Sequence, residues 1–123
     1  MVNDEIYTAL SSLDWVDGIY DTKLPDGYVV TGTVLVFSSV SETPDIAIDG
    51  DIVRQVARWQ VSVRSADITA ARAAKRAVIA ALHGYSGVFI ARCDFESSPG
   101  EIFEADVLPF QYHIPIDFMI QEA

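Results

Sequence analysis

The chain has few of the residues on which covalent and metal chemistry depend. Among its 123 residues, Cys93 is the only cysteine, and His83 and His113 are the only histidines. A single cysteine excludes an intrachain disulfide, and since Cys93 lies in an apolar, strand-like run we expect a buried, inert thiol. No apolar run approaches the roughly 18 residues of a membrane span, and Asp4 and Glu5 stand where a secretory signal would be positive. We therefore expect a protein made in a cytoplasm, with no membrane partner.

Basic residues are scarce and unevenly placed. The chain holds 18 Asp and Glu against eight Lys and Arg, for a formal net charge of −10. This argues against tight, sequence-independent binding to nucleic acid, which depends on Lys and Arg displacing counterions. Residues 1–51 carry −9, residues 52–92 carry +6 and residues 93–123 carry −7. A basic centre between two acidic segments favours charge pairing, either within one subunit across a sheet or between neighbouring copies.

Motifs for catalysis and for metal binding are also missing. No glycine-rich phosphate loop precedes a helix, no serine lies in a nucleophile-elbow pattern, and Cys93 has no partner base. His113 and Asp117 share one strand face but supply too few ligands for a metal. The acidic residues at 45–51 lack the regular alternate spacing of a calcium loop.

Two further groups of polar residues have ordinary interpretations. Glu101, Glu104 and Asp106 lie in a polar turn without an apolar pocket that would make one of them a catalytic acid. His83 stands at a helix end beside Gly84, where a histidine side chain commonly contacts the last carbonyls. We therefore expect no enzymatic activity, no cofactor and no metal.

The composition that is present predicts one folded domain, residues 1–123. Half of the residues are apolar and 11% are aromatic, far from the disordered regime. Residues 3–13 predict a short helix with Asn3 as its cap. Residues 67–83 predict the main helix, capped by Ser65 or Asp67. Its apolar stripe is Ile68, Ala71, Val78, Ile79 and Leu82.

The clearest strand pattern lies in residues 52–64. Two sets of residues alternate there, which indicates one buried and one wetter strand face. The first set is Val53, Ala57, Trp59, Val61 and Val63, and the second includes Arg54, Arg58, Gln60, Ser62 and Arg64. We expect Trp59 in the core. The arginines form either a face neutralised by neighbouring acids or a docking surface for another subunit's acidic loop.

Three more segments predict strands. Residues 28–40, with a bend at Gly32, residues 88–95 and residues 110–121 have the composition or alternation of strands. Because Pro115 lacks a backbone donor, we expect the last strand at a sheet edge or with a bulge there. The predicted fold is α+β: an antiparallel or mixed sheet of four to five strands, with the main helix on one face and a short N-terminal helix. One helix covers only part of such a sheet, which favours oligomers.

Residues 41–51 predict a long, exposed hairpin loop. They are rich in Asp with a proline and a glycine, and long loops in small domains tend to be functional or mobile. We expect this loop and the basic strand face to form an assembly interface. Its candidate residues are Ser41, Glu42, Thr43, Asp45, Ile46, Ile48, Asp49, Asp51, Arg54, Arg58 and Arg64.

Several motifs together resemble one known family. They are Tyr28-Val29-Val30 after a proline, the loop from Val40-Ser41-Glu42-Thr43-Pro44 to Asp49-Gly50, Val61-Ser62-Val63, Ala70-Ala71 in the helix, and Tyr112-His113-Ile114-Pro115-Ile116-Asp117-Phe118. In order and spacing they look like the tail completion, or tail terminator, family of tailed bacteriophages and prophage-like elements. The resemblance covers nearly the whole chain, with residues 1–26 matching least.

The resemblance implies a structural virion protein made in the cytoplasm of a bacterial host. Members form a ring, commonly hexameric, at the head-proximal end of the tail, where they end tube polymerisation and join the tail to the head connector. The implied partners are copies of the chain, the tail tube protein and the head-tail connector or stopper, with DNA only passing through the ring. The alternatives are another neck subunit and a small cytoplasmic oligomeric ligand-binding protein or enzyme.

Overall fold

The computed structural model describes residues 2–25, 30–46, 52–104 and 111–122. Within them the fold is α+β, as the sequence predicts. The elements in chain order are α1 Val2–Leu10, β1 Gly18–Asp21, β2 Thr33–Ile46, β3 Ile52–Ser65, α2 Ile68–Leu82, β4 Ile90–Ser97, β5 Ile102–Glu104 and β6 Gln111–Glu122.

The described strands form one mixed sheet of six strands. Their order is β1-β2-β3-β6-β4, and β5 also pairs with β6. Only β1 lies parallel to its neighbour, while the other pairings are antiparallel. The count exceeds the expected four to five because β1 and β5 were not expected. They contain four and three residues, too few for an alternation to be recognised.

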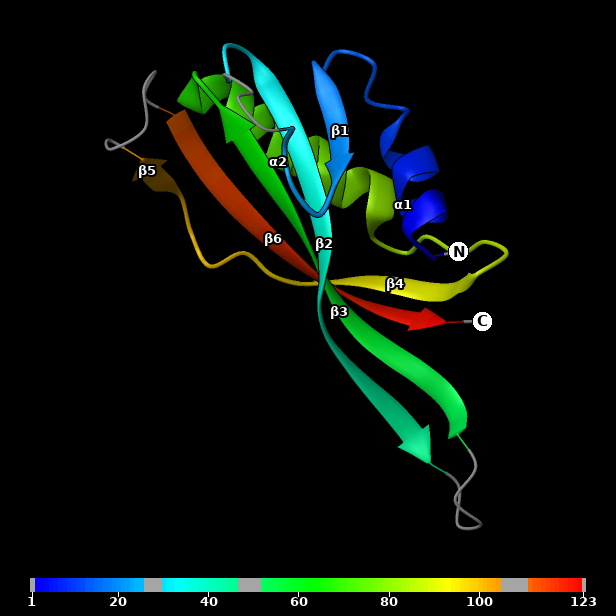
Figure 1. Ribbon diagram of the computed structural model, residues 1–123. Coiled ribbons are helices and arrows are strands. Elements are labelled where there is room, and N and C mark those ends of the chain that lie inside the picture. The colour runs from blue at the N-terminus through cyan, green and yellow to red at the C-terminus, as the bar shows by residue number, and fades with distance from the viewer. Residues whose placement is uncertain (1, 26–29, 47–51, 105–110, 123) are drawn as a thin grey trace.

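Both helices pack against the same face of this sheet and close one hydrophobic core (Figure 1). Alternate residues of β2, β3 and β6 point into that core, as the period-two pattern predicts. The largest fully buried side chains include Phe37 and Phe118. Trp59 is half-buried against this core, with its ring centroid 6.4 Å from that of Phe37. The core prediction for β3 is confirmed at Ala57, Val61 and Val63.

Both residues proposed to cap α2 contribute to its start. The Asp67 carboxylate accepts a hydrogen bond from the Thr69 N–H at 3.2 Å, and the Ser65 hydroxyl oxygen accepts one from the Asp67 N–H at 3.2 Å. These bonds satisfy donors that a helix leaves unpaired at its first turn. At the other end, Gly84 has a φ of 80°, a conformation that favours glycine and ends the helix.

The prediction for α1 was wrong at both ends. Asn3 lies inside the helix and does not cap it, and its side-chain amide donates to the Asp21 carboxylate at 3.1 Å. The helix ends at Leu10 and not at residue 13. The hydroxyls of Ser11 and Ser12 donate to carbonyls of the last turn at 2.7 and 3.0 Å, a local interaction that competes with continuation of a helix.

The prediction of a loop over residues 41–51 was wrong in its first half. β2 continues to Ile46 and stays paired with β3, after a register shift between Ser39 and Ser41. Pro44 is tolerated because β1 pairs with β2 only as far as Phe37, so no strand among the described residues pairs with the outer side of β2 there. The rest of that segment, residues 47–51, lies outside the described residues.

Pro115 does not mark a sheet edge, because β6 lies between β3 and the strands β4 and β5. The Pro115 carbonyl accepts a hydrogen bond from the Ser98 hydroxyl at 2.8 Å, and a residue's nitrogen points to the same side as its carbonyl in an antiparallel strand. On that side, β5 pairs with β6 up to His113 and β4 pairs from Asp117 onward. The N–H that Pro115 lacks would therefore lie in the gap between the paired segments of β5 and β4.

β2 begins at Thr33, and not at residue 28 as predicted. The Asp17 carboxylate accepts a hydrogen bond from the Thr33 N–H at 3.0 Å. One of its oxygens lies only 1.7 Å from where a Cβ at position 32 would be, so any other residue there would force this carboxylate to move. Gly32 lies directly before the strand, where the sequence predicted a bend within it.

Candidate assembly interface

The sheet face turned away from the helices carries a row of polar side chains, which we call the polar face. On β3 it contains Arg58, Gln60, Ser62 and Arg64, which pair in register with Met119, Asp117, Pro115 and His113 of β6. Because side chains alternate along a strand, this row shares its backbone with the buried core residues on the opposite face.

At one end of the polar face, Glu104 of β5 joins three other side chains. Its carboxylate lies 3.1 Å from Arg64 Nη1 and 3.3 Å from His113 Nδ1, and it accepts a hydrogen bond from Gln111 at 3.0 Å. Burial disfavours the ionised form of Glu104, but the Gln111 hydrogen bond and the charge of Arg64 outweigh it, so its pKa lies below the usual value. Burial, with the charge of Arg64, lowers the pKa of His113.

Further along β3, the other predicted docking arginine is also paired inside the subunit. Arg58 Nη2 lies 2.5 Å from Glu96 Oε1, and Gln60 donates to the Asp117 carboxylate at 3.0 Å. The acids that neutralise Arg58 and Arg64 both come from the acidic third segment of the chain. Within this chain, Arg58 and Arg64 therefore each have a neighbouring acid as a partner.

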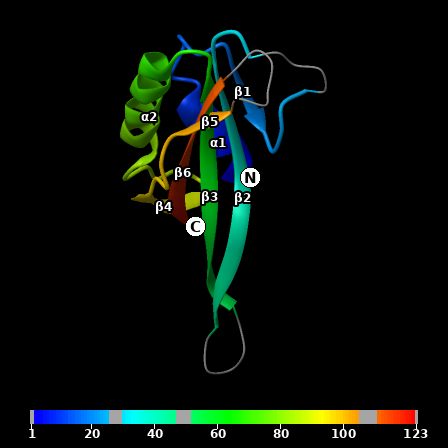
Figure 2. The same cartoon turned by 90° about the vertical axis from the view of Figure 1, so that its left-hand side faces the viewer.

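The remaining candidate residues lie on a two-stranded projection, which we call the arm. β6 pairs with β3 from Val56 onward, so among the described strands Ile52–Gln55 of β3 pair with β2 alone. Figures 1 and 2 show this end of β2 and β3 extending well beyond the body of the domain. The arm and its base carry Ser41, Glu42, Thr43, Asp45, Ile46 and Arg54, while Ile48, Asp49 and Asp51 lie outside the described residues.

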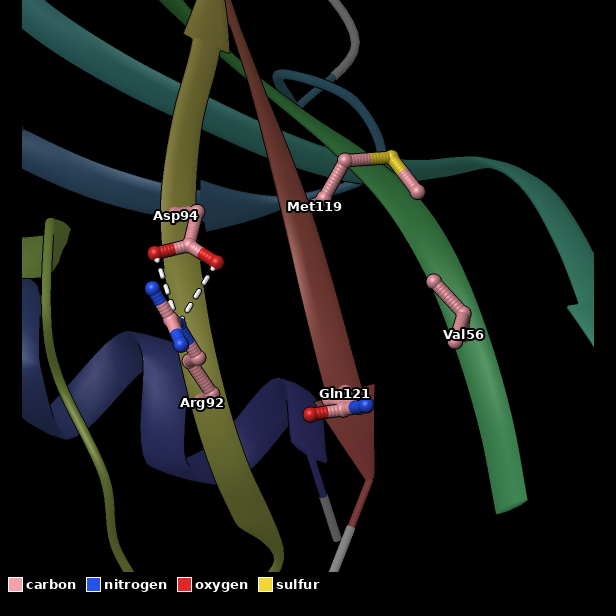
Figure 3. Close-up of a pocket in the computed structure, with 5 residues that line it drawn as sticks. All are labelled: Val56, Arg92, Asp94, Met119 and Gln121. Carbon is pink, nitrogen blue, oxygen red and sulfur yellow. Dashed lines mark hydrogen bonds and ion pairs between the residues drawn. The ribbon is translucent and has the colours of Figure 1, made fainter. Parts of the chain in front are cut away.

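A hollow of about 360 Å³ lies on the sheet where β3, β6 and β4 diverge, and Figure 3 shows its lining. It is lined by Val56, Arg92, Asp94, Met119 and Gln121. The Arg92 guanidinium and the Asp94 carboxylate bond to each other, with Nε 2.8 Å from Oδ2, and do not converge on the space between the strands. This arrangement differs from ligand sites, which are mostly apolar with a few converging polar groups.

The remaining reactive groups are used structurally. Cys93 is fully buried, as predicted, and burial, followed by the charge of Asp94, raises the pKa of its thiol to about 12. His83 Nδ1 accepts a hydrogen bond from the Phe95 N–H at 3.0 Å, so the prediction that its side chain contacts helix carbonyls was wrong. Within the described ranges, no three His, Cys, Asp or Glu side chains gather as metal ligands, and no helix is long and apolar enough to cross a membrane.

Comparison with known proteins gives a likeness in fold. No protein-family model matches the chain, and a search of the curated proteins also finds no match. Among solved structures, the chain is similar to one from the virion of a native gene transfer agent particle, with a TM-score of 0.64. The two are 21% identical, over 95% of this chain and 90% of the other. The fold of this domain is therefore one that also occurs in a chain of a virion.

Proposed function

We propose that this protein is a structural subunit of a tailed phage or prophage-like particle. In this proposal, copies form a ring, hexameric in the first instance, at the head-proximal end of the tail, where they end tube polymerisation and join the tail to the head connector. The observation that carries the proposal is the likeness in fold to a chain of a gene transfer agent virion along nearly the whole length of both chains. The motif order that resembles tail terminators supports the finer assignment.

The arm supports an assembly role. A two-stranded hairpin is marginally stable in water on its own, since it has no second layer to cover it. Beyond Phe37 the outer side of β2 pairs with no described strand, and Ile52–Gln55 of β3 have β2 as their only described partner. An open strand edge pairs readily with another chain. The arm thus fits a neighbouring copy or the tail tube, through Ser41–Ile46 of β2 and Arg54 of β3. Ile48, Asp49 and Asp51 stay candidates from the sequence alone.

The chemistry of the described residues also favours a role in protein–protein contacts. The charged groups of the polar face and of the hollow beside β4 bond to one another and leave no converging set for a substrate. The partners in this proposal are further copies, the tail tube protein and the connector or stopper. DNA passes through the ring without specific binding, in keeping with the net charge of −10.

The native mass of the purified protein, with negative-stain images, tests the ring. We expect a closed ring of six copies. A chain that remains a monomer at all concentrations, alone and with its tail tube protein, would exclude this function. Labelled electron microscopy of intact particles then separates a terminator from another neck subunit, because only the former lies directly on the end of the tail tube.

A deletion tests the arm. Removing residues 46–48 leaves the core residues of β2 and β3 in place, so we expect a folded protein that forms fewer rings and tails of abnormal length. Far-ultraviolet circular dichroism checks the fold, and electron microscopy measures the tails. Normal rings and normal tails would exclude the arm from assembly.

A further inference from the structure

Trp15 is the largest of the apolar side chains that are exposed in the described part of the chain, with an exposed fraction of 49%. Others lie elsewhere on the surface, such as Val88 and Phe89 in the loop before β4 and Ile102 and Phe103 on β5. Scattered exposed apolar residues are ordinary. Tryptophan, however, is among the residues most enriched where protein interfaces gain most of their energy. Trp15 is therefore a candidate anchor for a partner.

The turn that carries Trp15, residues 11–17, is held firmly by the rest of the domain. Leu13 is 6% exposed and packs in the hydrophobic core. The Asp17 N–H donates to the Thr33 carbonyl at 2.7 Å, and the Asp17 carboxylate accepts from the Thr33 N–H at 3.0 Å. A side chain on an already ordered backbone loses less entropy on binding, which is the usual gain from preorganisation.

The surface around Trp15 is acidic. Residues 2–22, which contain α1 and β1, carry five carboxylates and no Lys or Arg. Asp14, directly before Trp15, is exposed, and its side chain forms no hydrogen bond or ion pair among the described residues. The turn therefore presents a large ring and an unpaired negative charge side by side.

The helix α2 has the opposite charge. It carries Arg72, Lys75 and Arg76 and no acid. Arg72 already holds Glu101 through two hydrogen bonds, at 2.6 and 3.0 Å. These bonds lower the pKa of Glu101, and Lys75 is near enough to add to that effect. Arg76 is exposed and has no hydrogen-bond or ion-pair partner in the part of the chain that the structure describes. Its charge is therefore open to an acid of another chain.

Arg76 lies on a helix face with room for an aromatic ring. It stands two residues from both Ala74 and Val78 of the buried stripe, so it points away from the sheet. Its neighbours on that outer side, three residues before it and four after it, are Ala73 and Ala80. Small neighbours let a ring approach the helix closely, and a guanidinium stacks favourably on the face of tryptophan.

The two surfaces lie at different places on the domain. In Figure 1, α1 and the turn that follows it lie at the right, while α2 begins at the left and runs behind the sheet. In Figure 2, no described element covers α2 on the side away from the sheet. Both halves of a complementary pair thus occur on one chain. A contact between them joins copies head to tail, and such contacts close into rings when the rotation between subunits permits it.

Building on the ring of the proposed function, we propose that Asp14 and Trp15 of one copy dock on the outer side of α2 of the next copy. The Trp15 ring lies over the Arg76 guanidinium, and the Asp14 carboxylate meets the same positive charge. Burial of the ring supplies most of the affinity, while the opposite charges fix the orientation of the two copies.

An exchange of charges tests the pairing. Arg76→Glu places two carboxylates opposite each other, so the dissociation constant of the ring should rise at least about tenfold, measured by native mass over a series of concentrations. Adding Asp14→Arg restores a pair of opposite sign and should bring the constant back toward the wild-type value. The control is Arg92→Glu, which makes the same change of charge at a side chain that is 69% exposed on β4.

Two results of this exchange would overturn the contact. One is an equal rise for Arg76→Glu and Arg92→Glu, because net charge alone would then explain the loss. The other is a double variant that assembles no better than Arg76→Glu alone.

A second pair of variants tests the anchor. Trp15→Ala should also raise the dissociation constant of the ring at least about tenfold. The control is Phe89→Ala, because Phe89 is 47% exposed and its loop is bound to Glu5, in the first half of α1 and away from the turn. Equal dissociation constants for the two variants would exclude Trp15 from the interface.

Crosslinking between two variants tests the direction of the contact. Ser12 and Ala80 are exposed and lie three residues from Trp15 and four from Arg76. Ser12→Cys and Ala80→Cys are purified separately, mixed while dissociated, concentrated and treated with a short bismaleimide. Cys93 does not interfere because it is fully buried with a pKa raised to about 12. We expect a covalent dimer from the mixture and none from either variant alone.

The outcomes separate this contact from the ring itself. A Ser12→Cys variant that crosslinks to itself would mean a symmetric contact and would overturn the proposal. A native ring whose mixed variants do not crosslink would overturn this contact and leave the proposed function standing. A wild-type chain that never assembles would contradict the proposed function and this contact together.

Discussion

The two faces of the sheet use the same strands in different ways. Toward the helices, Phe118 and Ile116 of β6 are fully buried in one hydrophobic core. On the polar face, their sequence neighbour Asp117 and the adjacent residues of β3 form hydrogen bonds and ion pairs. The apolar face lowers the free energy of the fold through burial, while charged pairs at partly exposed sites contribute little.

This difference bears on which surfaces of the domain could serve the proposed assembly. Arg58 and Arg64 are already neutralised inside the subunit, by Glu96 and Glu104. A partner that took over these arginines would have to break existing pairs and would gain little net energy. The surfaces with unmet apolar or strand-edge character lie elsewhere, at the arm, at β5, at the loop before β4 and at the turn that carries Trp15. The predictions below test the division between the two faces.

The largest expected effect is at the core. Phe118→Ala removes a fully buried ring that contacts Phe95 edge-to-face, with ring centroids 6.1 Å apart. The free energy of unfolding should fall by about 3–5 kcal/mol, measured by urea denaturation. The control is Met119→Ala, because Met119 is the next residue on β6 and points to the polar face. If Met119→Ala lowers the free energy of unfolding as much as Phe118→Ala does, the division between the two faces of the sheet is contradicted.

A smaller effect is expected at the most buried acid of the polar face. Asp117 is 8% exposed and accepts a hydrogen bond from Gln60 at 3.0 Å. Asp117→Ala leaves the Gln60 amide without that acceptor, so the free energy of unfolding should fall by about 1–3 kcal/mol. Glu96→Ala at the more exposed end of the same face is the comparison and should cost less. An unchanged urea midpoint for Asp117→Ala would mean that this hydrogen bond is unimportant.

His113 should give the polar face a pH dependence. Burial, with the charge of Arg64, lowers its pKa in the folded protein below the ordinary 6.5. The unfolded chain therefore binds the proton first, so the free energy of unfolding is full above about pH 6.5 and falls as the pH drops toward the folded pKa. His113→Gln should remove this decline, measured by urea denaturation between pH 7.5 and 5. The lower limit of that range, pH 5, keeps clear of Glu104, whose lowered pKa matters only below its ordinary 4.5. If the free energy of unfolding of His113→Gln still declines over this pH range, other titratable groups cause the decline.

The smallest effect is expected at the ion pair of Arg58 and Glu96. Their side chains are 42% and 33% exposed, and pairs at such sites typically contribute about 0–1 kcal/mol. Arg58→Ala should therefore shift the free energy of unfolding by less than about 1 kcal/mol and less still at high salt, because salt screens exposed pairs. Thermal unfolding at two salt concentrations measures this. A loss of several kcal/mol would mean that the charged pairs of the polar face contribute substantially to the free energy of unfolding.

Much of the fold could be predicted because its signals are local. The alternation of β3 and β6, the apolar stripe of α2 and the Asp67 cap each involve residues within a few positions of one another. The short strands β1 and β5 could not be predicted, since each is held by a neighbour distant in the sequence. The continuation of β2 through Pro44 depends in the same way on its pairing with β3.

The candidate site was less predictable for the same reason. Which acid neutralises Arg58 or Arg64 depends on strand register and on partners 38 and 40 residues away. The presentation of Val88 and Phe89 depends on Glu5, 83 and 84 residues distant. The sequence contains one signal for that loop, two large apolar residues directly after a glycine. The same pattern also predicts the start of a strand.

The length distribution of tails assembled without this protein tests the central claim most directly. If copies of this chain end the growth of the tail tube, particles made without it should contain tubes far longer than normal and heads without tails, as measured by electron microscopy. Supplying the wild-type chain should restore the normal length. Tails of normal length attached to heads in its absence would contradict the account.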